Sequence, residues 1–256
     1  MPSSVLLLHG FTGSPRSFDS ILELAQLEPG RRCLVPTLVG HDGLPPPAGA
    51  QSQGFNQEVD RLAALAASAD GDFFVLGYSL GARLALALLV QHSELFRGAL
   101  LIGAQPGLET EAERAERRAL DARWIELLET QGIERFVDAW GSQPLFGTQR
   151  RLPSESLHAQ RRLRLAHHPA GLALSLRALG LSEMPSLRTE LGRLGMPVEL
   201  WTGELDGKFC AIADELSTLL PDARRITVAG VGHNLVLERP ELIAEALRRT
   251  QSWYTS

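Results

Sequence analysis

The stretch Gly77-Tyr-Ser-Leu-Gly81 decides the fold, because it sets a serine between two glycines in the pattern Gly-x-Ser-x-Gly. An apolar run, 73–76, precedes it, and a run of good helix formers, 82–91, follows it. A serine between a strand and a helix lies on a strained turn, and the flanking glycines keep Cβ atoms away from the crowded backbone. The turn lifts the hydroxyl out of the sheet and places it at a helix N-terminus, where N–H groups can stabilise an anion. The pattern therefore predicts Ser79 as a reactive serine.

Short apolar runs alternate with longer helical patterns on both sides of this motif. That alternation is typical of parallel strands joined by crossover helices. The strands are expected at 5–8, 33–35, 73–76, 99–102, 198–201 and 225–228, and helices at 18–27, 56–69, 82–91 and 240–250.

The alternation stops between residues 105 and 185, where the sequence is helical, rich in arginine and glutamate, and contains Trp124, Phe136, Trp140 and Phe146. The segment lies between two expected core strands. We therefore expect an α/β core formed by residues 1–104 and 186–256, with 105–185 inserted as a helical cap.

An acid and a histidine follow Ser79 in chain order, as the α/β-hydrolase fold requires. His233 lies in Gly230-Val-Gly-His-Asn after the last expected strand, and Asp206 lies in Gly203-Glu-Leu-Asp-Gly after the strand at 198–201. The spacing between the two has room for one helix and one strand. Ser79, Asp206 and His233 are therefore the expected catalytic triad, with Glu204 as the competing acid. The fold class predicted is an α/β-hydrolase fold with a mostly parallel sheet flanked by helices.

The loop after the first strand, His9-Gly10-Phe11, is where this fold supplies an oxyanion-hole donor. A second donor comes from the residue after the nucleophile. We expect the backbone N–H groups of Phe11 and Leu80 to fill these roles, and His9 to be a structural, hydrogen-bonded histidine.

Composition excludes several classes of partner. The 256 residues carry a net charge of −5 with a pI near 5.8, which argues against nucleic acid or an anionic membrane as partner. No apolar stretch approaches the roughly 20 residues of a membrane span, and no signal peptide is evident. The two cysteines, Cys33 and Cys210, read as free thiols of a cytoplasmic protein. No cluster at metal-ligand spacing and no phosphate-binding glycine loop occurs, so neither metal nor cofactor is expected.

Fold and triad leave the chemistry open, because the same fold serves esterases, lyases and non-catalytic receptors. A haloalkane dehalogenase would need an aspartate at position 79, and a binding module would not need a complete triad. The charges around Ser79 must separate a hydrolase from a lyase.

Three motifs carry a more specific signal: Gly77-Tyr-Ser-Leu-Gly-Ala-Arg83, Ala139-Trp-Gly-Ser-Gln-Pro-Leu-Phe146 and Gly203-Glu-Leu-Asp-Gly-Lys-Phe209. With these the chain resembles, over nearly its whole length, the 2-succinyl-6-hydroxy-2,4-cyclohexadiene-1-carboxylate synthases, lyases of menaquinone biosynthesis. It departs from their pattern at Ala82, in the 38–42 loop and at Val231, none of which is in the triad.

The resemblance implies a polycarboxylate substrate held by Arg83, Arg117, Trp140, Arg161 and Lys208. A guanidinium binds a carboxylate through two parallel N–H donors. Lys208 is the only lysine among 25 basic residues, which favours a role for it. The neighbours Arg118 and Arg162 leave the assignment of Arg117 and Arg161 open by one position.

The implied reaction is the elimination of pyruvate from 2-succinyl-5-enolpyruvyl-6-hydroxy-3-cyclohexene-1-carboxylate, without an acyl-enzyme. The alternative is a carboxylesterase that uses the same triad for covalent acyl transfer. An esterase for neutral esters should have an apolar pocket, whereas the lyase should converge three arginines on Ser79.

Overall fold

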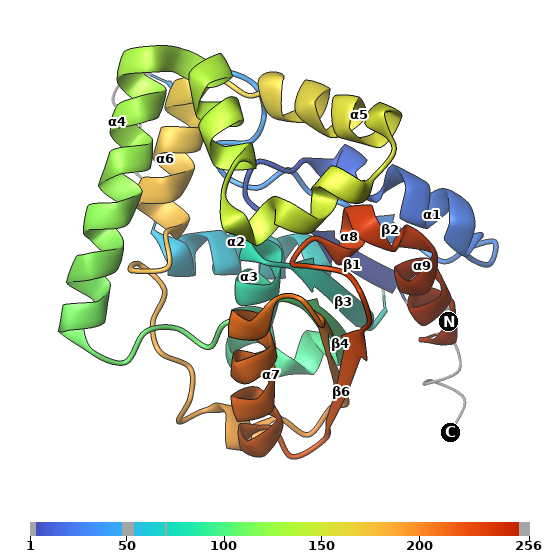
Figure 1. Ribbon diagram of the computed structural model, residues 1–256. Helices are drawn as coiled ribbons and strands as arrows, with labels where there is room; N and C mark the ends of the chain where they lie inside the picture. Colours follow the sequence, from blue (N-terminus) through green and yellow to red (C-terminus); the bar gives the residue numbers. More distant parts are fainter. Residues whose placement is uncertain (1–3, 48–53, 70, 251–256) are drawn as a thin grey trace.

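A parallel sheet forms the centre of the protein in the computed structural model, which describes residues 4–47, 54–69 and 71–250 (Figure 1). Within these residues the sheet has six strands in the order β2-β1-β3-β4-β5-β6. They are β1 (Ser4–Leu8), β2 (Cys33–Leu34), β3 (Phe73–Tyr78), β4 (Phe96–Ile102), β5 (Val198–Gly203) and β6 (Ala223–Val228). All neighbouring pairs are parallel, so the strand positions and the α/β class predicted from the alternation are confirmed.

Helices cover both faces of the sheet, as the crossover connections require. They are α1 (Asp19–Ala25), α2 (Phe55–Ala67), α3 (Leu80–Gln91), α4 (Glu111–Gly141), α5 (Ser154–Leu165), α6 (Pro169–Leu179), α7 (Gly207–Leu219), α8 (Leu235–Glu238) and α9 (Pro240–Arg249). Helices α2, α3 and α7 pack on one face, and α1, α8 and α9 on the other. The side chains of the central strands β1 and β3 are thereby buried against two apolar layers, whereas Arg224 and Arg225 of the edge strand β6 are exposed.

Between β4 and β5 the chain adds α4, α5 and α6, which Figure 1 shows as the green, yellow and gold helices beside and above the sheet. Helix α4 bends at Gly132, whose φ of +76° lies outside helical geometry. Phe136 and Leu172 are buried in a separate apolar cluster between these helices. No helix in the described part of the chain is both long enough and apolar enough to cross a bilayer.

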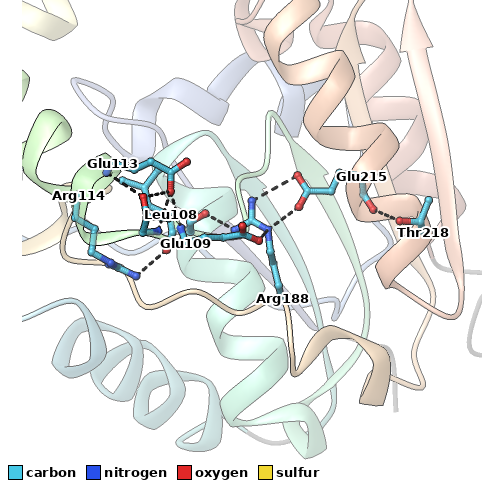
Figure 2. Close-up of polar contacts among 9 residues, drawn as sticks. Leu108, Glu109, Glu113, Arg114, Arg188, Glu215 and Thr218 are labelled. Carbon is cyan, nitrogen blue, oxygen red and sulfur yellow. Dashed lines mark hydrogen bonds and ion pairs between the residues drawn. The ribbon is translucent and has the colours of Figure 1, made fainter.

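The two connections to these helices are tied together by arginines (Figure 2). Arg114 of α4 donates to the Leu108 carbonyl at 2.8 Å, as Figure 2 shows. It also donates to the Ser182 carbonyl at 3.0 Å, which joins the outgoing connection to the returning one. Arg188 on the returning connection donates to Glu215 of α7 at 2.6 Å. The contacts fix where the inserted helices leave and rejoin the core.

Three buried histidines, His9, His41 and His167, pack edge to face beside the first strand, with ring centroids 4.9 and 5.3 Å apart. His9 donates from Nδ1 to the Gly10 carbonyl at 2.9 Å and accepts the Leu38 N–H at Nε2, so it is neutral and fully hydrogen-bonded. Burial lowers the pKa of His9 to about 4. This agrees with the structural role expected for it.

We predict that this buried histidine makes the protein less stable in acid. The unfolded chain binds a proton at His9 below about pH 6.5, whereas the folded protein does so only near pH 4, so stability falls as the pH drops through this window. The difference between the pKa of His9 in the folded and the unfolded protein corresponds to about 3 kcal/mol in the free energy of unfolding. Urea unfolding between pH 7 and pH 4 should show a shallower loss for His9→Gln than for the wild type. The exposed control His158→Gln should follow the wild type, and equal slopes for all three proteins would contradict the assignment.

Candidate active site

Ser79 occupies the sharp turn between β3 and α3. Its φ is +53°, a conformation that residues other than glycine rarely adopt. A Cβ on Gly81 would lie 2.0 Å from the Leu8 carbonyl oxygen, and one on Gly77 would lie 2.4 Å from the Gly81 carbonyl oxygen. The glycines are therefore needed because backbone passes against backbone on both sides of the serine.

The structure brings Ser79, Asp206 and His233 together at the carboxyl ends of β3, β5 and β6, respectively. His233 Nε2 lies 3.0 Å from the Ser79 hydroxyl, and His233 Nδ1 lies 2.7 Å from Asp206 Oδ2. His233 and Asp206 are buried. A buried carboxylate at this distance fixes the imidazole with Nδ1 protonated and leaves Nε2 free to take the serine proton.

Asp206, rather than the competing Glu204, lies against the histidine. Asp206 precedes α7 and also accepts the Phe209 N–H at its other oxygen, so its carboxylate has a fixed orientation. Glu204 is exposed and accepts the Gly230 N–H at 2.9 Å. Glu204 therefore helps to shape the loop that leads to His233, at a separate place from the imidazole.

Phe11 and Leu80, the expected oxyanion-hole residues, line one cavity together with Ser79. Leu80 is the first residue of α3, where the N–H has no partner inside the helix. Within the described ranges, no hydrogen bond uses the N–H of Phe11 or of Leu80. Both amides are therefore available to a negatively charged oxygen next to the serine.

The cavity has a volume of about 360 Å³, which is within the range of small-molecule sites. Residues of β3, α3 and the inserted helices form its wall, including Tyr78, Leu120, Trp124 and Leu176. Among the residues with described positions, no group of three histidine, cysteine or acidic side chains could hold a metal ion.

Comparison with known proteins gives the family. Residues 5–246 match the family model described as "Alpha/beta hydrolase family". The 2-succinyl-6-hydroxy-2,4-cyclohexadiene-1-carboxylate synthase of Enterobacter sp. (strain 638) is 33% identical over 244 residues, 95% of this chain and 89% of that protein. The chain belongs to this synthase family of α/β hydrolases.

Solved structures agree with this membership. The structure of MenH from S. aureus superposes with a TM-score of 0.90 at 27% identity, covering 98% of this chain and 94% of that one. A thermophilic esterase from Thermogutta terrifontis has a TM-score of 0.79 at 22% identity, covering 97% and 89% of the two chains. The esterase shares the fold alone, so the side chains around the synthase-family triad must indicate the chemistry.

Two of the expected arginines, Arg83 and Arg117, line the cavity beside the triad. Arg83 donates to the Leu179 carbonyl at 2.9 Å, and burial, with Arg117 nearby, lowers the pKa of Arg83 to about 9. The guanidinium therefore stays charged at neutral pH. Arg117 donates from Nε to both oxygens of Asp121 at 3.0 Å, while its terminal nitrogens make no hydrogen bond within the described residues. Both arginines retain donors for a bound carboxylate.

The third expected arginine does not reach the cavity. Arg161 lies on the exposed side of α5, where it pairs with Asp138 of α4 at 2.9 Å, and its side chain is 45% exposed. Its neighbour Arg162 is exposed as well. The expectation that Arg161 converges on Ser79 is therefore wrong, because its side chain is held at the surface by Asp138 and does not line the cavity.

Arg164, which sequence reasoning missed, is the arginine on the inward face of α5. It is only 7% exposed, and its guanidinium lies 5.1 Å from the centre of the ring of Phe146, which lines the cavity, although Arg164 itself does not. Burial lowers the pKa of Arg164. No signal in the sequence separated Arg164 from Arg161, because packing against neighbouring helices decides which side of α5 is buried.

Trp140 and Lys208 both line the cavity, as expected. The Trp140 ring stacks on Phe136 and meets Phe11 edge to face, and its buried indole N–H has no partner among the described residues. Lys208 lies at the exposed start of α7 with its ammonium 5.6 Å from the Phe209 ring centre. Trp140 therefore supplies part of the aromatic wall of the cavity, and Lys208 supplies a positive charge at its edge.

Proposed function

We propose that the protein is a lyase that eliminates pyruvate from 2-succinyl-5-enolpyruvyl-6-hydroxy-3-cyclohexene-1-carboxylate to give 2-succinyl-6-hydroxy-2,4-cyclohexadiene-1-carboxylate. The observation that carries the proposal is the meeting of Arg83 and Arg117 with Ser79 in one cavity. Neutral esters do not need buried guanidinium groups, whereas a substrate with three carboxylates does. The names of the relatives support the same substrate.

In this proposal Ser79 acts as a base. His233, oriented by Asp206, takes the Ser79 proton, and the serine oxygen removes the ring proton α to the succinyl ketone. Electrons move through the ring double bond and expel enolpyruvate, which is protonated to pyruvate. The negative charge that develops on the ketone oxygen is stabilised by the Phe11 and Leu80 amides. This chemistry requires neither a metal nor a cofactor.

The arginines bind the substrate and take no part in proton transfer. Arg83 and Arg117 lie on α3 and on α4, so a carboxylate between them joins the core to the inserted helices. We propose that residues 105–185 act as a cap, and that Arg164, which is buried against Phe146 of the cavity wall, is a third cation near the substrate. Trp140 and Lys208 complete the binding set. The free thiols of Cys33 and Cys210 support a cytoplasmic location.

Replacing Arg117 with alanine should lower kcat/KM for pyruvate release roughly 30-fold, because a partly buried partner of a carboxylate is worth about 2 kcal/mol. Arg118→Ala is the matched control, since Arg118 pairs with Glu111 and does not line the cavity. It should stay within about twofold of the wild type. Any ester hydrolysis should change little in either variant, and equal losses in pyruvate release for both would contradict carboxylate binding by Arg117.

The proposal as a whole is tested by supplying the purified protein with the enolpyruvyl substrate and, separately, with short-chain nitrophenyl esters. Rapid pyruvate release with negligible ester hydrolysis is the expected result. Rapid ester turnover without pyruvate would instead identify a carboxylesterase, and no turnover of either compound would reject both enzymes.

A further inference from the structure

Thr12, directly after Phe11, has a backbone conformation that threonine rarely adopts. Its φ is +63°, in the left-handed region, and the residue is buried. A β-branched residue stays in this region only where its surroundings hold it there. The turn that contains it is closed by a hydrogen bond from the Gly13 N–H to the Gly10 carbonyl at 2.9 Å.

Two imidazoles bind the backbone of Thr12, one on each side. The Thr12 N–H donates to His41 Nε2 at 3.3 Å, and the Thr12 carbonyl accepts from His167 Nε2 at 3.2 Å. The N–H of Thr12 belongs to the peptide unit that leaves Phe11. Fixing this unit therefore restrains the backbone of Phe11, which lines the cavity together with Ser79.

His41 can accept only as a neutral ring with its proton on Nδ1. Nδ1 lies 3.0 Å from the Val39 carbonyl, to which it donates, and this leaves the Nε2 lone pair for Thr12. Burial, with His9 and His167 alongside, holds the pKa of His41 well below its usual range. The ring therefore remains an acceptor at neutral pH.

His41 is itself held by α2, and His167 comes from the inserted helices. The Val39 N–H donates to Oε1 of Glu58 at 3.1 Å, and fully buried Glu58 is paired with Arg61 at 2.7 Å. His167 follows the end of α5. The two contacts on Thr12 thus connect the loop at Phe11 both to the core and to the proposed cap.

We propose that His41 and His167 are positioning residues that clamp the peptide groups of Thr12 and thereby hold the Phe11 N–H in the oxyanion hole. The inference rests on the proposed function, in which Phe11 is one of the two donors. Neither histidine touches the reacting atoms.

Two pairs of variants test the clamp. His41→Leu and His167→Leu remove the hydrogen bonds, whereas His41→Gln and His167→Gln keep an amide oxygen and an amide NH2 group that can replace the imidazole contacts. Removing an oxyanion donor costs about 10²- to 10³-fold in kcat, so a misplaced donor should cost less, roughly tenfold. We expect each leucine variant to lose about this much in kcat with KM nearly unchanged, and each glutamine variant to recover most of it.

A second readout needs no substrate. Ring 15N shifts of the wild type should show His41 protonated at Nδ1 and His167 at Nε2, both neutral at pH 7. The Phe11 amide resonance should move in His41→Leu and return toward its wild-type position in His41→Gln. If the leucine variants do not fold, the ring shifts of the wild type and the glutamine variants still test the clamp.

Unchanged kcat in folded leucine variants, equal losses in leucine and glutamine variants, or a His41 ring protonated at Nε2 would overturn the clamp. If the wild type releases no pyruvate, the proposed function is wrong. The ring shifts and the Phe11 amide resonance then test the clamp independently of that function.

Discussion

Replacing Ser79 with alanine is expected to lower kcat for pyruvate release roughly 10⁴-fold, the upper range for loss of a general base. The hydroxyl lies 3.0 Å from His233 Nε2, and no other side-chain hydroxyl on the described residues is bonded to that ring. Alanine removes the atom that takes the substrate proton but leaves Arg83 and Arg117 in place. KM should therefore change little, and the rate can be followed by coupling pyruvate to lactate dehydrogenase.

The matched control is Ser142→Ala. Ser142 is exposed, and its hydroxyl bonds only the Ala139 carbonyl in the described structure. This variant should keep the wild-type kcat. A Ser79→Ala protein that retained more than about a tenth of the wild-type rate would show that another group removes the proton.

Asp206→Asn is the second large effect, with an expected loss in kcat of roughly 10⁴-fold, as in other triads that lose the acid. An asparagine in the place of the carboxylate would present its NH2 group to His233 Nδ1 and favour the tautomer with the proton on Nε2. That tautomer cannot accept the Ser79 proton. The binding arginines are untouched, so substrate affinity should be preserved.

Glu204→Gln separates this role from a general effect of charge on the same loop. Glu204 is two residues away and bonds the Gly230 N–H, a contact that the glutamine oxygen can keep. Its kcat should stay within about threefold of the wild type. A larger loss in Glu204→Gln than in Asp206→Asn would exchange the roles of the two acids. The kinetics of both variants, measured with saturating substrate, give this comparison.

The turn at Ser79, the strands and the proximity of the three triad residues could be predicted from the sequence, because short-range constraints determine them. Two glycines around Ser79 indicate close backbone contacts, and in a parallel sheet the carboxyl ends of the strands lie at one edge. Asp206 and His233 each follow such a strand. Their positions near Ser79 could therefore be predicted without knowledge of side-chain packing.

The binding residues on the inserted helices could be predicted only in part. Arg117 lines the cavity, but on α5 the sequence does not show which face is turned inward, because packing against neighbouring helices decides it. A shift of three residues, from Arg161 to Arg164, moves the side chain from an exposed pair with Asp138 to a buried place over Phe146.

The clamp on Thr12 could not be predicted at all. It joins residues 29 and 155 positions apart in the chain, and it depends on a threonine in a left-handed conformation that its type disfavours. Contacts of this kind are set by tertiary structure. The departure from the family pattern in the 38–42 loop was the one sign that this region is unusual.

The central claim is that Ser79 removes a proton and does not attack a carbonyl. The most direct test mixes enzyme and enolpyruvyl substrate, quenches the mixture in acid during the first turnovers, and measures the mass of the intact protein together with the pyruvate formed. We predict pyruvate release with the protein at its unmodified mass at every time point. A transient adduct on Ser79 that forms and decays at the rate of turnover would contradict the account.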